Sequence, residues 1–214
     1  PCMHYLSDED VLALELQANE IRQSIIEMLV EAGSGHTAGP LDMADIFTLL
    51  YFEVLKHNPK DPFWADRDRL ILSNGHICPV LYATMAHAGY FPKEELLTLR
   101  KFGSRLQGHP HREALPGIET SSGPLGSGLS QAIGMALGER MDNPYSSKYF
   151  YCLMGDGELN EGQIWEALLH AGKEKLHNLI AIVDRNGIQI DGYTKDVMPL
   201  EPLREKLEAF NWDV

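Results

Sequence analysis

The stretch from residue 149 to residue 184 constrains the fold more than any other part of this sequence. It reads as a strand over 149–154, a loop over 155–161, a helix over 162–175 and a second strand over 179–184. A short crossover of this kind joins parallel strands, almost always in the right-handed sense. With a further short strand at 69–72 and a helix from there to about residue 88, it predicts an α/β fold: a parallel β-sheet flanked by helices.

The first half of the chain is expected to be mainly helical. A helix is predicted from Ser7, a good capping residue, to about Gly33. Its apolar face is expected to include Leu12, Leu16, Ile25, Ile26, Leu29 and Val30. A glycine-rich loop over 33–40 then precedes a second helix. The apolar side of that helix carries Met43, Ile46, Phe47, Leu50 and Tyr51.

Two further segments are predicted from their composition. Residues 103–123 are rich in Gly, Pro, His and Ser and read as an ordered loop, because helices flank them closely. The helix over 129–140 carries a row of small residues, which indicates either tight packing within the fold or a subunit contact. These residues are Ala132, Gly134, Ala136 and Gly138.

Composition bounds the domain count and the partners. The 214 residues, 44% of them apolar, predict a single domain over 1–214. The sequence begins with Pro1, and residues 210–214 read as the start of a strand, so we expect a domain truncated at its C-terminal end. With 18 Lys and Arg against 31 Asp and Glu, the net charge of -13 argues against nucleic acid and anionic membranes as partners.

Neither a membrane segment nor a disulfide framework is predicted. The sequence contains no apolar run of roughly 18 to 20 residues and no leader pattern. Cys2, Cys78 and Cys152 are widely spaced and form no pattern typical of disulfides or of a thiolate zinc site. These features favour a reducing, cytoplasmic location.

Oxygen ligands follow the two strands of the βαβ unit. Asp156 comes just after the first strand and Asn186 just after the second. If these parallel strands are neighbours, about 5 Å apart, both side chains reach one cation at the edge where open α/β sheets bind ligands. A carboxylate, an amide oxygen and the carbonyl of Ile188 suit Mg²⁺ or Ca²⁺, with water and phosphate completing the shell. Such an ion, together with helix N-termini, would let an acidic protein hold a diphosphate.

Five blocks of residues, in order, resemble a known family. They are Gly-Ser-Gly-His-Thr-Ala-Gly-Pro-Leu at 33–41, Ser-Asn-Gly-His at 73–76, Gly-His-Pro-His at 108–111, Thr-Ser-Ser-Gly-Pro-Leu-Gly-Ser-Gly-Leu-Ser at 120–130, and Gly-Asp-Gly-Glu-Leu-Asn-Glu-Gly at 155–162 continued by Asp-Arg-Asn-Gly-Ile-Gln-Ile-Asp-Gly at 184–192. The last block resembles the thiamine diphosphate signature, and nearly the whole chain is similar to the N-terminal, diphosphate-binding part of transketolases. Arg185 departs from the Asn-Asn of many thiamine enzymes, but only the second position, Asn186, is needed as a ligand.

The resemblance implies a thiamine diphosphate-binding fold of the diphosphate (PP) type and a set of cofactor contacts. It assigns the metal ion, Mg²⁺ or Ca²⁺, to Asp156, Asn186 and Ile188. It assigns the cofactor to these residues and to Gly155, Gly157, His76, Gly123 and Leu125, the last of which packs on the thiazolium ring.

The resemblance also implies catalytic histidines. On composition alone His36, His76 and His109 are more typical of surface or core residues. In transketolases the matching imidazoles bind the hydroxyls of the donor sugar and move protons, a task that suits a group titrating near neutrality. His111 has no such counterpart and is interpreted as part of the loop.

Two glutamates allow two interpretations. Glu161 and Glu166 lie near a predicted helix start, where carboxylates stabilise the helix. The resemblance instead implies a carboxylate network at the subunit contact, in which Glu161 supports catalysis.

The implied activity is transfer of a two-carbon ketol unit from a ketose or ketose phosphate to an aldose or aldose phosphate, as in the pentose phosphate pathway. The pyrimidine-binding domain that activates the cofactor is absent from these 214 residues. The chain is therefore expected to be the N-terminal subunit of a split transketolase, joined to a C-terminal subunit in an α2β2 heterotetramer.

The alternatives are a deoxyxylulose-phosphate synthase, one subunit of an E1-type 2-oxo acid decarboxylase, and a non-catalytic cofactor-binding scaffold. The Gly-His loops favour transketolase over the first two. A scaffold predicts loss of Asp156, Asn186 or the histidines, and all are present.

Overall fold

The computed structural model describes residues 6–214, so Cys2 lies outside the described residues. Contacts within the chain divide it into two compact units. The helical unit comprises residues up to Arg67 together with His76–Gly117, and the sheet unit comprises Asp68–Gly75 together with Ile118–Val214. The prediction that residues 1–214 form one truncated cofactor-binding domain stays a prediction.

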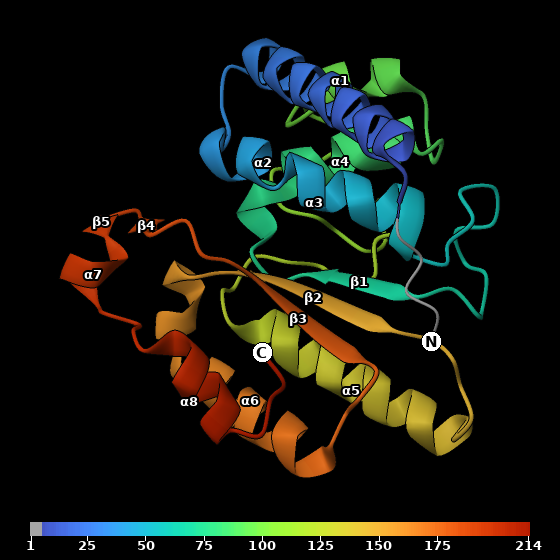
Figure 1. Cartoon of the computed structure of the whole chain (residues 1–214). Coiled ribbons are helices and arrows are strands. Elements are labelled where there is room, and N and C mark those ends of the chain that lie inside the picture. Colours follow the sequence, from blue (N-terminus) through green and yellow to red (C-terminus); the bar gives the residue numbers. More distant parts are fainter. Residues whose placement is uncertain (1–5) are drawn as a thin grey trace. The chain divides into compact units, whose positions relative to one another are not determined.

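Helix α1 (Asp8–Ala32) opens the helical unit (Figure 1). As predicted, Ser7 caps it: the Ser7 hydroxyl accepts from the N–H of Asp10, and the Asp10 carboxylate accepts from the N–H of Ser7. The helix ends at Gly33, whose φ of 63° is left-handed.

The predicted apolar face of α1 was only partly right. Ile25 and Leu29 are buried, whereas Leu12, Leu16, Ile26 and Val30 are exposed. The buried stripe is offset from the predicted one. It is formed by Ala18, Ile21, Ile25, Met28 and Leu29. These positions follow the three- and four-residue spacing of a single helix face, and the exposed residues lie outside it.

The rest of the helical unit is built from short helices. The second predicted helix is divided into α2 (Ala38–Asp42), α3 (Ala44–Leu49) and a π-helical turn, η1 (Leu50–Val54). They are followed by η2 (Gly75–Ile77), the buried α4 (Cys78–His87) and the 3₁₀ helix η3 (Lys93–Thr98). Helix α1 packs on α3 and α4 (Figure 1).

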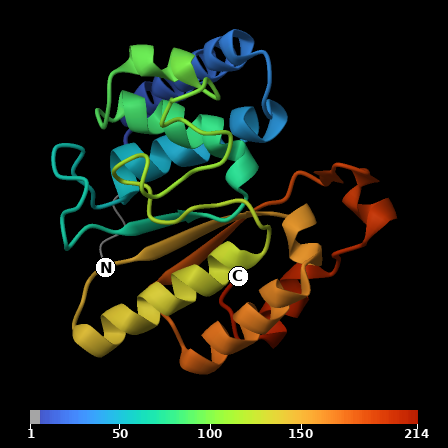
Figure 2. The same ribbon diagram turned by 180° about the vertical axis from the view of Figure 1, so that it is seen from behind.

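The sheet unit contains the predicted parallel sheet. Its strands are β1 (Arg69–Leu72), β2 (Phe150–Gly155) and β3 (Leu179–Asp184), in the order β1-β2-β3. Helices α5 (Ser127–Asp142) and α6 (Gly162–Glu174) run beside each other along this sheet (Figure 2). The α/β class and the βαβ unit are confirmed.

The small residues of α5 divide between two faces. Ala132 and Ala136 are buried in the core of the sheet unit. A Cβ placed on Gly134 or Gly138 would meet no heavy atom within 4 Å. Packing therefore accounts for the two alanines, and a subunit contact at the two glycines stays a prediction.

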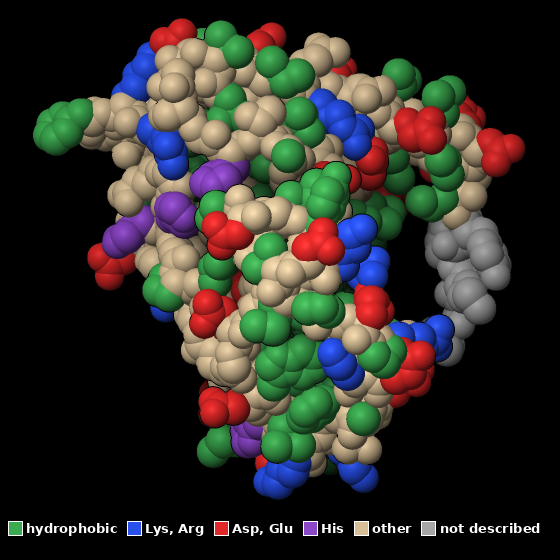
Figure 3. Space-filling view, turned by 90° about the vertical axis from the view of Figure 1, so that its left-hand side faces the viewer, with side chains coloured by type: hydrophobic (Ala, Val, Ile, Leu, Met, Phe, Trp, Pro, Cys, Tyr) green, Lys and Arg blue, Asp and Glu red, His purple; other side chains and the backbone are tan. Residues whose placement is uncertain are grey.

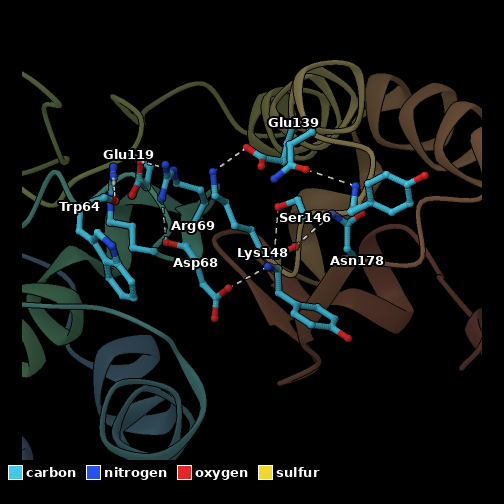
Figure 4. Close-up of polar contacts among 12 residues, drawn as sticks. Trp64, Asp68, Arg69, Glu119, Glu139, Ser146, Lys148 and Asn178 are labelled. Carbon is cyan, nitrogen blue, oxygen red and sulfur yellow. Dashed lines mark hydrogen bonds and ion pairs between the residues drawn. The ribbon is translucent and has the colours of Figure 1, made fainter.

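Ion pairs and hydrogen bonds tie together the amino ends of the strands (Figure 4). The Arg69 guanidinium lies 3.6 Å from the Glu119 carboxylate, and the Lys148 ammonium lies 2.8 Å from that of Glu139. Asp68 accepts from the N–H of Tyr149 at 2.8 Å. Lysine and arginine thus neutralise carboxylates at this end of the sheet.

After the sheet come η4 (Gly157–Asn160), within the βαβ loop, and the hairpin of β4 (Ile188–Gln189) and β5 (Gly192–Tyr193), followed by α7 (Thr194–Val197) and α8 (Leu203–Ala209). The predicted strand over 210–214 was wrong. Backbone N–H groups of Phe210, Asn211 and Trp212 bond back to carbonyls of α8, so they close this helix and join no ladder. The Trp212 indole N–H donates to the Leu168 carbonyl at 3.0 Å.

Membrane-spanning helices and disulfides were both not expected from the sequence. No helix in residues 6–214 is long and apolar enough to span a membrane. Cys78 and Cys152 are both buried and free, so neither forms a disulfide within the described part of the chain.

Candidate functional site

The carboxyl ends of β2 and β3 bring the predicted metal ligands onto neighbouring loops. Gly155 is paired with Asp184 in the ladder, and the N–H of Asp156 donates to the Asp184 carbonyl at 3.0 Å. Asp156 is 1% exposed. Its Oδ2 accepts from the N–H of Gly187, directly after Asn186, at 2.7 Å. The predicted juxtaposition of the two loops is confirmed.

Backbone groups shape both loops. The Asp156 Oδ1 accepts from the N–H of Gly157 at 2.8 Å. The Asn186 side chain donates to Asp184 and accepts from the N–H of Ile188, each at 3.0 Å. A Cβ on Gly157 would lie 2.9 Å from the Cβ of Gln189 in β4, so glycine permits this close approach.

The residues present fit a hard cation and a diphosphate. Each bonded oxygen of Asp156 and Asn186 accepts one N–H group, which leaves a lone pair free on each. Carboxylate, amide and carbonyl oxygens are the ligands that Mg²⁺ and Ca²⁺ take. A Cβ at Gly123 or at Gly187 would meet no atom of the described residues within 4 Å, so both backbones face open space within this part of the chain. The described residues contain no group of three or more His, Cys, Asp and Glu placed to hold a metal. The predicted ligand set is of a different kind, because only Asp156 in it is one of these residue types.

The turn over 123–126, which contains the predicted cofactor residues Gly123 and Leu125, precedes α5. The hydroxyl of Ser122 donates to the Leu72 carbonyl at 2.5 Å, and the Gln163 side chain donates to the Leu125 carbonyl at 2.9 Å. Gly126 has a left-handed φ of 85°, which favours glycine. The Leu125 side chain is half-buried.

Glu158 is a residue of this site that the sequence did not reveal. It is 3% exposed. Its carboxylate accepts from the hydroxyl of Ser73, from the N–H of Gly126 at 2.6 Å and from the N–H of Gly155 at 3.2 Å. Burial raises the pKa of this carboxyl, and the hydrogen bond from Ser73 opposes that shift.

Asn74 was also missed. It follows Ser73 after β1, is 1% exposed, and its Oδ1 is a buried acceptor without a hydrogen-bond partner among the described residues. Its amide nitrogen lies 3.9 Å from where a Cβ on Gly155 would stand. An unsatisfied buried acceptor calls for a donor, which an ordered water can provide.

Glu161 and Glu166 lie at the start of α6, as the sequence predicts. Both are exposed. Glu161 occupies the N-cap position, but its side chain makes no capping hydrogen bond. Its part in a carboxylate network stays a prediction.

The three predicted histidines come together in the helical unit. The rings of His36 and His76 have centroids 4.9 Å apart. Burial, followed by the charges of His36 and His109, lowers the pKa of His76 to about 4, so, contrary to expectation, His76 does not titrate near neutrality. Burial, His36 and Arg100 also lower the pKa of His109. Histidine side chains gather on the face shown in Figure 3.

A pocket of about 460 Å³ in the helical unit lies beside the segments that carry His36 and His109. It is lined by Ser34, Arg100, Lys101, Ser104, Gln107 and Gly108. Arg100 has a left-handed φ of 61° and its guanidinium donates to the Ser34 hydroxyl at 3.3 Å. A Cβ on Gly108 would lie 2.7 Å from the Arg100 Nε, so glycine leaves room for the guanidinium. No sequence motif pointed to Arg100.

The fold is that of an α/β protein with a parallel sheet, a class whose ligands typically bind at the carboxyl ends of the strands. Residues 14–214 match the family model for the transketolase thiamine diphosphate binding domain. The chain belongs to this family.

Known relatives include proteins that are named as transketolase subunits. The chain is 46% identical over 206 residues to a 6-deoxy-6-sulfo-D-fructose transketolase subunit of a Clostridium species, covering 96% of this chain and 74% of that protein. It is 44% identical over 204 residues to an apulose-4-phosphate transketolase subunit of Phocaeicola vulgatus, covering 95% of this chain and 72% of that protein. These names support ketol transfer with thiamine diphosphate and do not favour the decarboxylase or scaffold alternatives.

Solved structures agree with this assignment. The transketolase of Leishmania mexicana superposes with a TM-score of 0.87 at 39% identity, covering 97% of this chain. The chain spans only 31% of that transketolase, against nearly three quarters of the two subunits named before it. The thiamine diphosphate-binding fold is thereby confirmed.

Proposed function

We propose that this chain is the diphosphate-binding subunit of a split transketolase, which moves a two-carbon ketol unit from a ketose to an aldose. The observation that carries the proposal is the link between the Asp156 and Asn186 loops through the N–H of Gly187, within a chain of this family. When bound, thiamine diphosphate supplies the carbanion chemistry of the reaction, and the protein binds and orients.

The sheet unit holds the cofactor in this proposal. Asp156, the Asn186 side chain and the Ile188 carbonyl would hold Mg²⁺, or Ca²⁺ in its place. The backbones of Gly155, Gly157 and Gly123 face the cofactor, and Leu125 packs against its thiazolium ring. The open space at Gly123 and the unused lone pairs of the oxygen ligands support these assignments.

The helical unit acts on the sugar in this proposal. His36, His76 and His109 bind donor hydroxyls and move protons at their ring nitrogens, and His76 also contacts the cofactor. The lowered pKa of His76 keeps its ring neutral near pH 7, so that it has one donor and one acceptor nitrogen. Arg100 and Lys101 in the adjoining pocket favour substrates that carry an anionic group such as a phosphate.

The partner in this proposal is a C-terminal subunit that carries the pyrimidine-binding domain, in an α2β2 assembly located in the cytoplasm. Two relatives are named transketolase subunits, which supports a divided enzyme. Glu161 would join a carboxylate network at the subunit contact, consistent with its exposure. The pentose phosphate pathway is the proposed setting.

The test uses the full-length subunit together with its partner subunit. Asp156→Ala is expected to lower the affinity for thiamine diphosphate with Mg²⁺ by about a hundredfold or more, because it removes a ligand. Calorimetric titration measures this, and Asp142→Ala, an exposed aspartate of α5, is the matched control. Unchanged affinity in Asp156→Ala would refute the metal assignment.

The histidine roles are tested in the same complex. His109→Ala is expected to lower the rate of ketol transfer by roughly a hundredfold with little change in cofactor affinity. His111→Ala is the control, because His111 is exposed in the same loop. An NMR titration is expected to give a His76 pKa of about 4. Equal turnover in the two variants would remove His109 from the catalytic residues.

A further inference from the structure

Glu158 connects three segments of the sheet unit. Its carboxylate accepts from the Ser73 hydroxyl after β1, from the Gly126 N–H at the start of α5 and from the Gly155 N–H at the end of β2. The Ser73 hydroxyl oxygen in turn accepts from the N–H of Gly128 at 3.0 Å. The Ser73–Glu158 pair therefore holds the N–H of Gly126, the N-cap residue of α5, and the N–H of Gly128 in its first turn.

Burying the Glu158 carboxylate costs desolvation free energy, which its hydrogen bonds must offset. Glu158 is buried, and an apolar side chain could fill the same space without desolvating a charge. The first N–H groups of a helix have no partner within that helix, so an acceptor from outside fixes the helix start. Hydrogen bonds to a charged acceptor are shorter and stronger than neutral ones.

We propose that Glu158 is a positioning residue that fixes the turn over 123–126, and with it Leu125, against the ends of β1 and β2. This inference rests on the proposed function, in which the turn faces the thiazolium end of the cofactor. A Cβ on Gly128 would lie 2.4 Å from the Cβ of Ser73, so the start of α5 lies directly against the end of β1. The hydrogen bonds of Glu158 to Ser73 and Gly126 hold these two segments together.

Apart from the Gly155 N–H, which donates to Glu158 at 3.2 Å, the hydrogen bonds that hold the diphosphate end of the site do not involve Glu158. Asp156 is fixed by the β2–β3 ladder and by the N–H groups of Gly157 and Gly187. Loss of the Glu158 carboxylate should therefore affect the ring-binding turn more than the diphosphate loops. A ligand with a thiazolium ring and a ligand without one distinguish the two effects.

The experiment compares Glu158→Gln with Glu139→Gln in the full-length subunit together with its partner subunit. Glu139 is a half-buried glutamate that pairs with Lys148 at the other end of the sheet unit and controls for general loss of a paired carboxylate. The probes are thiamine diphosphate and inorganic pyrophosphate, each with Mg²⁺, titrated calorimetrically. Glu158→Gln is expected to weaken thiamine diphosphate about tenfold, because an amide NH₂ replaces an accepting oxygen. Pyrophosphate affinity is expected to change less than about twofold.

Equal losses for both ligands, or no loss for either, would overturn the positioning role. Failure of the wild-type complex to bind thiamine diphosphate would overturn the proposed function and this inference together. Wild-type binding with an unchanged Glu158→Gln variant would overturn this inference alone.

A milder variant covers the case in which Glu158→Gln does not fold. Ser73→Ala removes one of the three groups that bond to Glu158 and is expected to show the same selective loss at smaller size. Faster amide exchange at Gly126 and Gly128, with the β2–β3 ladder still protected, is expected in Ser73→Ala. Unchanged exchange and unchanged thiamine diphosphate affinity in this variant would overturn the inference.

Discussion

Carboxylates at the two ends of the parallel sheet differ in the groups that they contact. At the amino ends of the strands, Glu119 and Glu139 lie against Arg69 and Lys148 (Figure 4). At the carboxyl ends, Asp156 accepts from backbone N–H groups, and in the described part of the chain it pairs with no lysine or arginine. Backbone N–H groups orient a carboxylate without neutralising it. Asp156 is therefore not neutralised by an ion pair within the described residues, although Arg185, directly after β3, pairs with Glu201.

Glu158 extends this contrast. Like Asp156, it is held by N–H groups and, in addition, by a hydroxyl. Burial raises the pKa of Glu158, which has no lysine or arginine partner within residues 6–214, whereas Lys148 lowers the pKa of Glu139. Glu119 and Glu139 at one end of the sheet are thus held by ion pairs, whereas Glu158 at the other end is held by N–H and hydroxyl donors.

The largest expected effect concerns metal removal at the carboxyl end. Chelation of Mg²⁺ should weaken thiamine diphosphate by about a hundredfold or more, because the diphosphate and Asp156 then repel each other. The unfolding midpoint of the cofactor-free subunit should stay unchanged, because N–H groups already satisfy the Asp156 oxygens. Calorimetric titration and thermal unfolding with and without chelator measure both. Metal-independent cofactor binding would contradict the contrast between the two ends.

An intermediate effect is expected at the amino end. Asp68→Ala removes the acceptor of the Tyr149 N–H. Asp68 is only 6% exposed, so this hydrogen bond is lost at a buried position. The free energy of unfolding should fall by about 1–3 kcal/mol. Cofactor affinity should not change, because Asp68 and Asp156 lie at opposite ends of the strands. Urea unfolding tests the first expectation, with Asp142→Ala as the control. A parallel loss of cofactor affinity would show that the two ends are not independent.

The sequence predicted the carboxyl end of the sheet well because the information there is local. A strand, a short loop, a helix and a second strand place Asp156 and Asn186 on neighbouring loops through the handedness of one crossover. The role of Glu158 was not predicted from the sequence, because its partners Ser73 and Gly126 are 85 and 32 residues away along the chain. No short motif encodes such contacts.

Other errors had tertiary causes. Apolar residues lie all around α1, and which side becomes buried depends on α3 and α4, so Leu12 and Val30 were placed on the wrong face. Residues 210–214 have the composition of a strand, yet their N–H groups close α8. Local propensity was overridden by a helix end in one case and by packing partners in the other.

The smallest expected effect is a pH dependence at the amino end. The hydrogen bond from Lys148 lowers the pKa of Glu139 from its ordinary value of 4.5 in the folded protein. A lowered pKa means that the unfolded chain binds the proton more readily, so the stabilisation is present above pH 4.5 and is lost as the pH falls through the lowered folded pKa. Glu139→Gln should therefore cost about 1 kcal/mol at pH 7 and much less at the most acidic pH at which the protein still folds. Urea unfolding of both proteins at the two pH values measures the difference. An equal cost at both would show that packing of the side chain, and not its charge, accounts for the stabilisation.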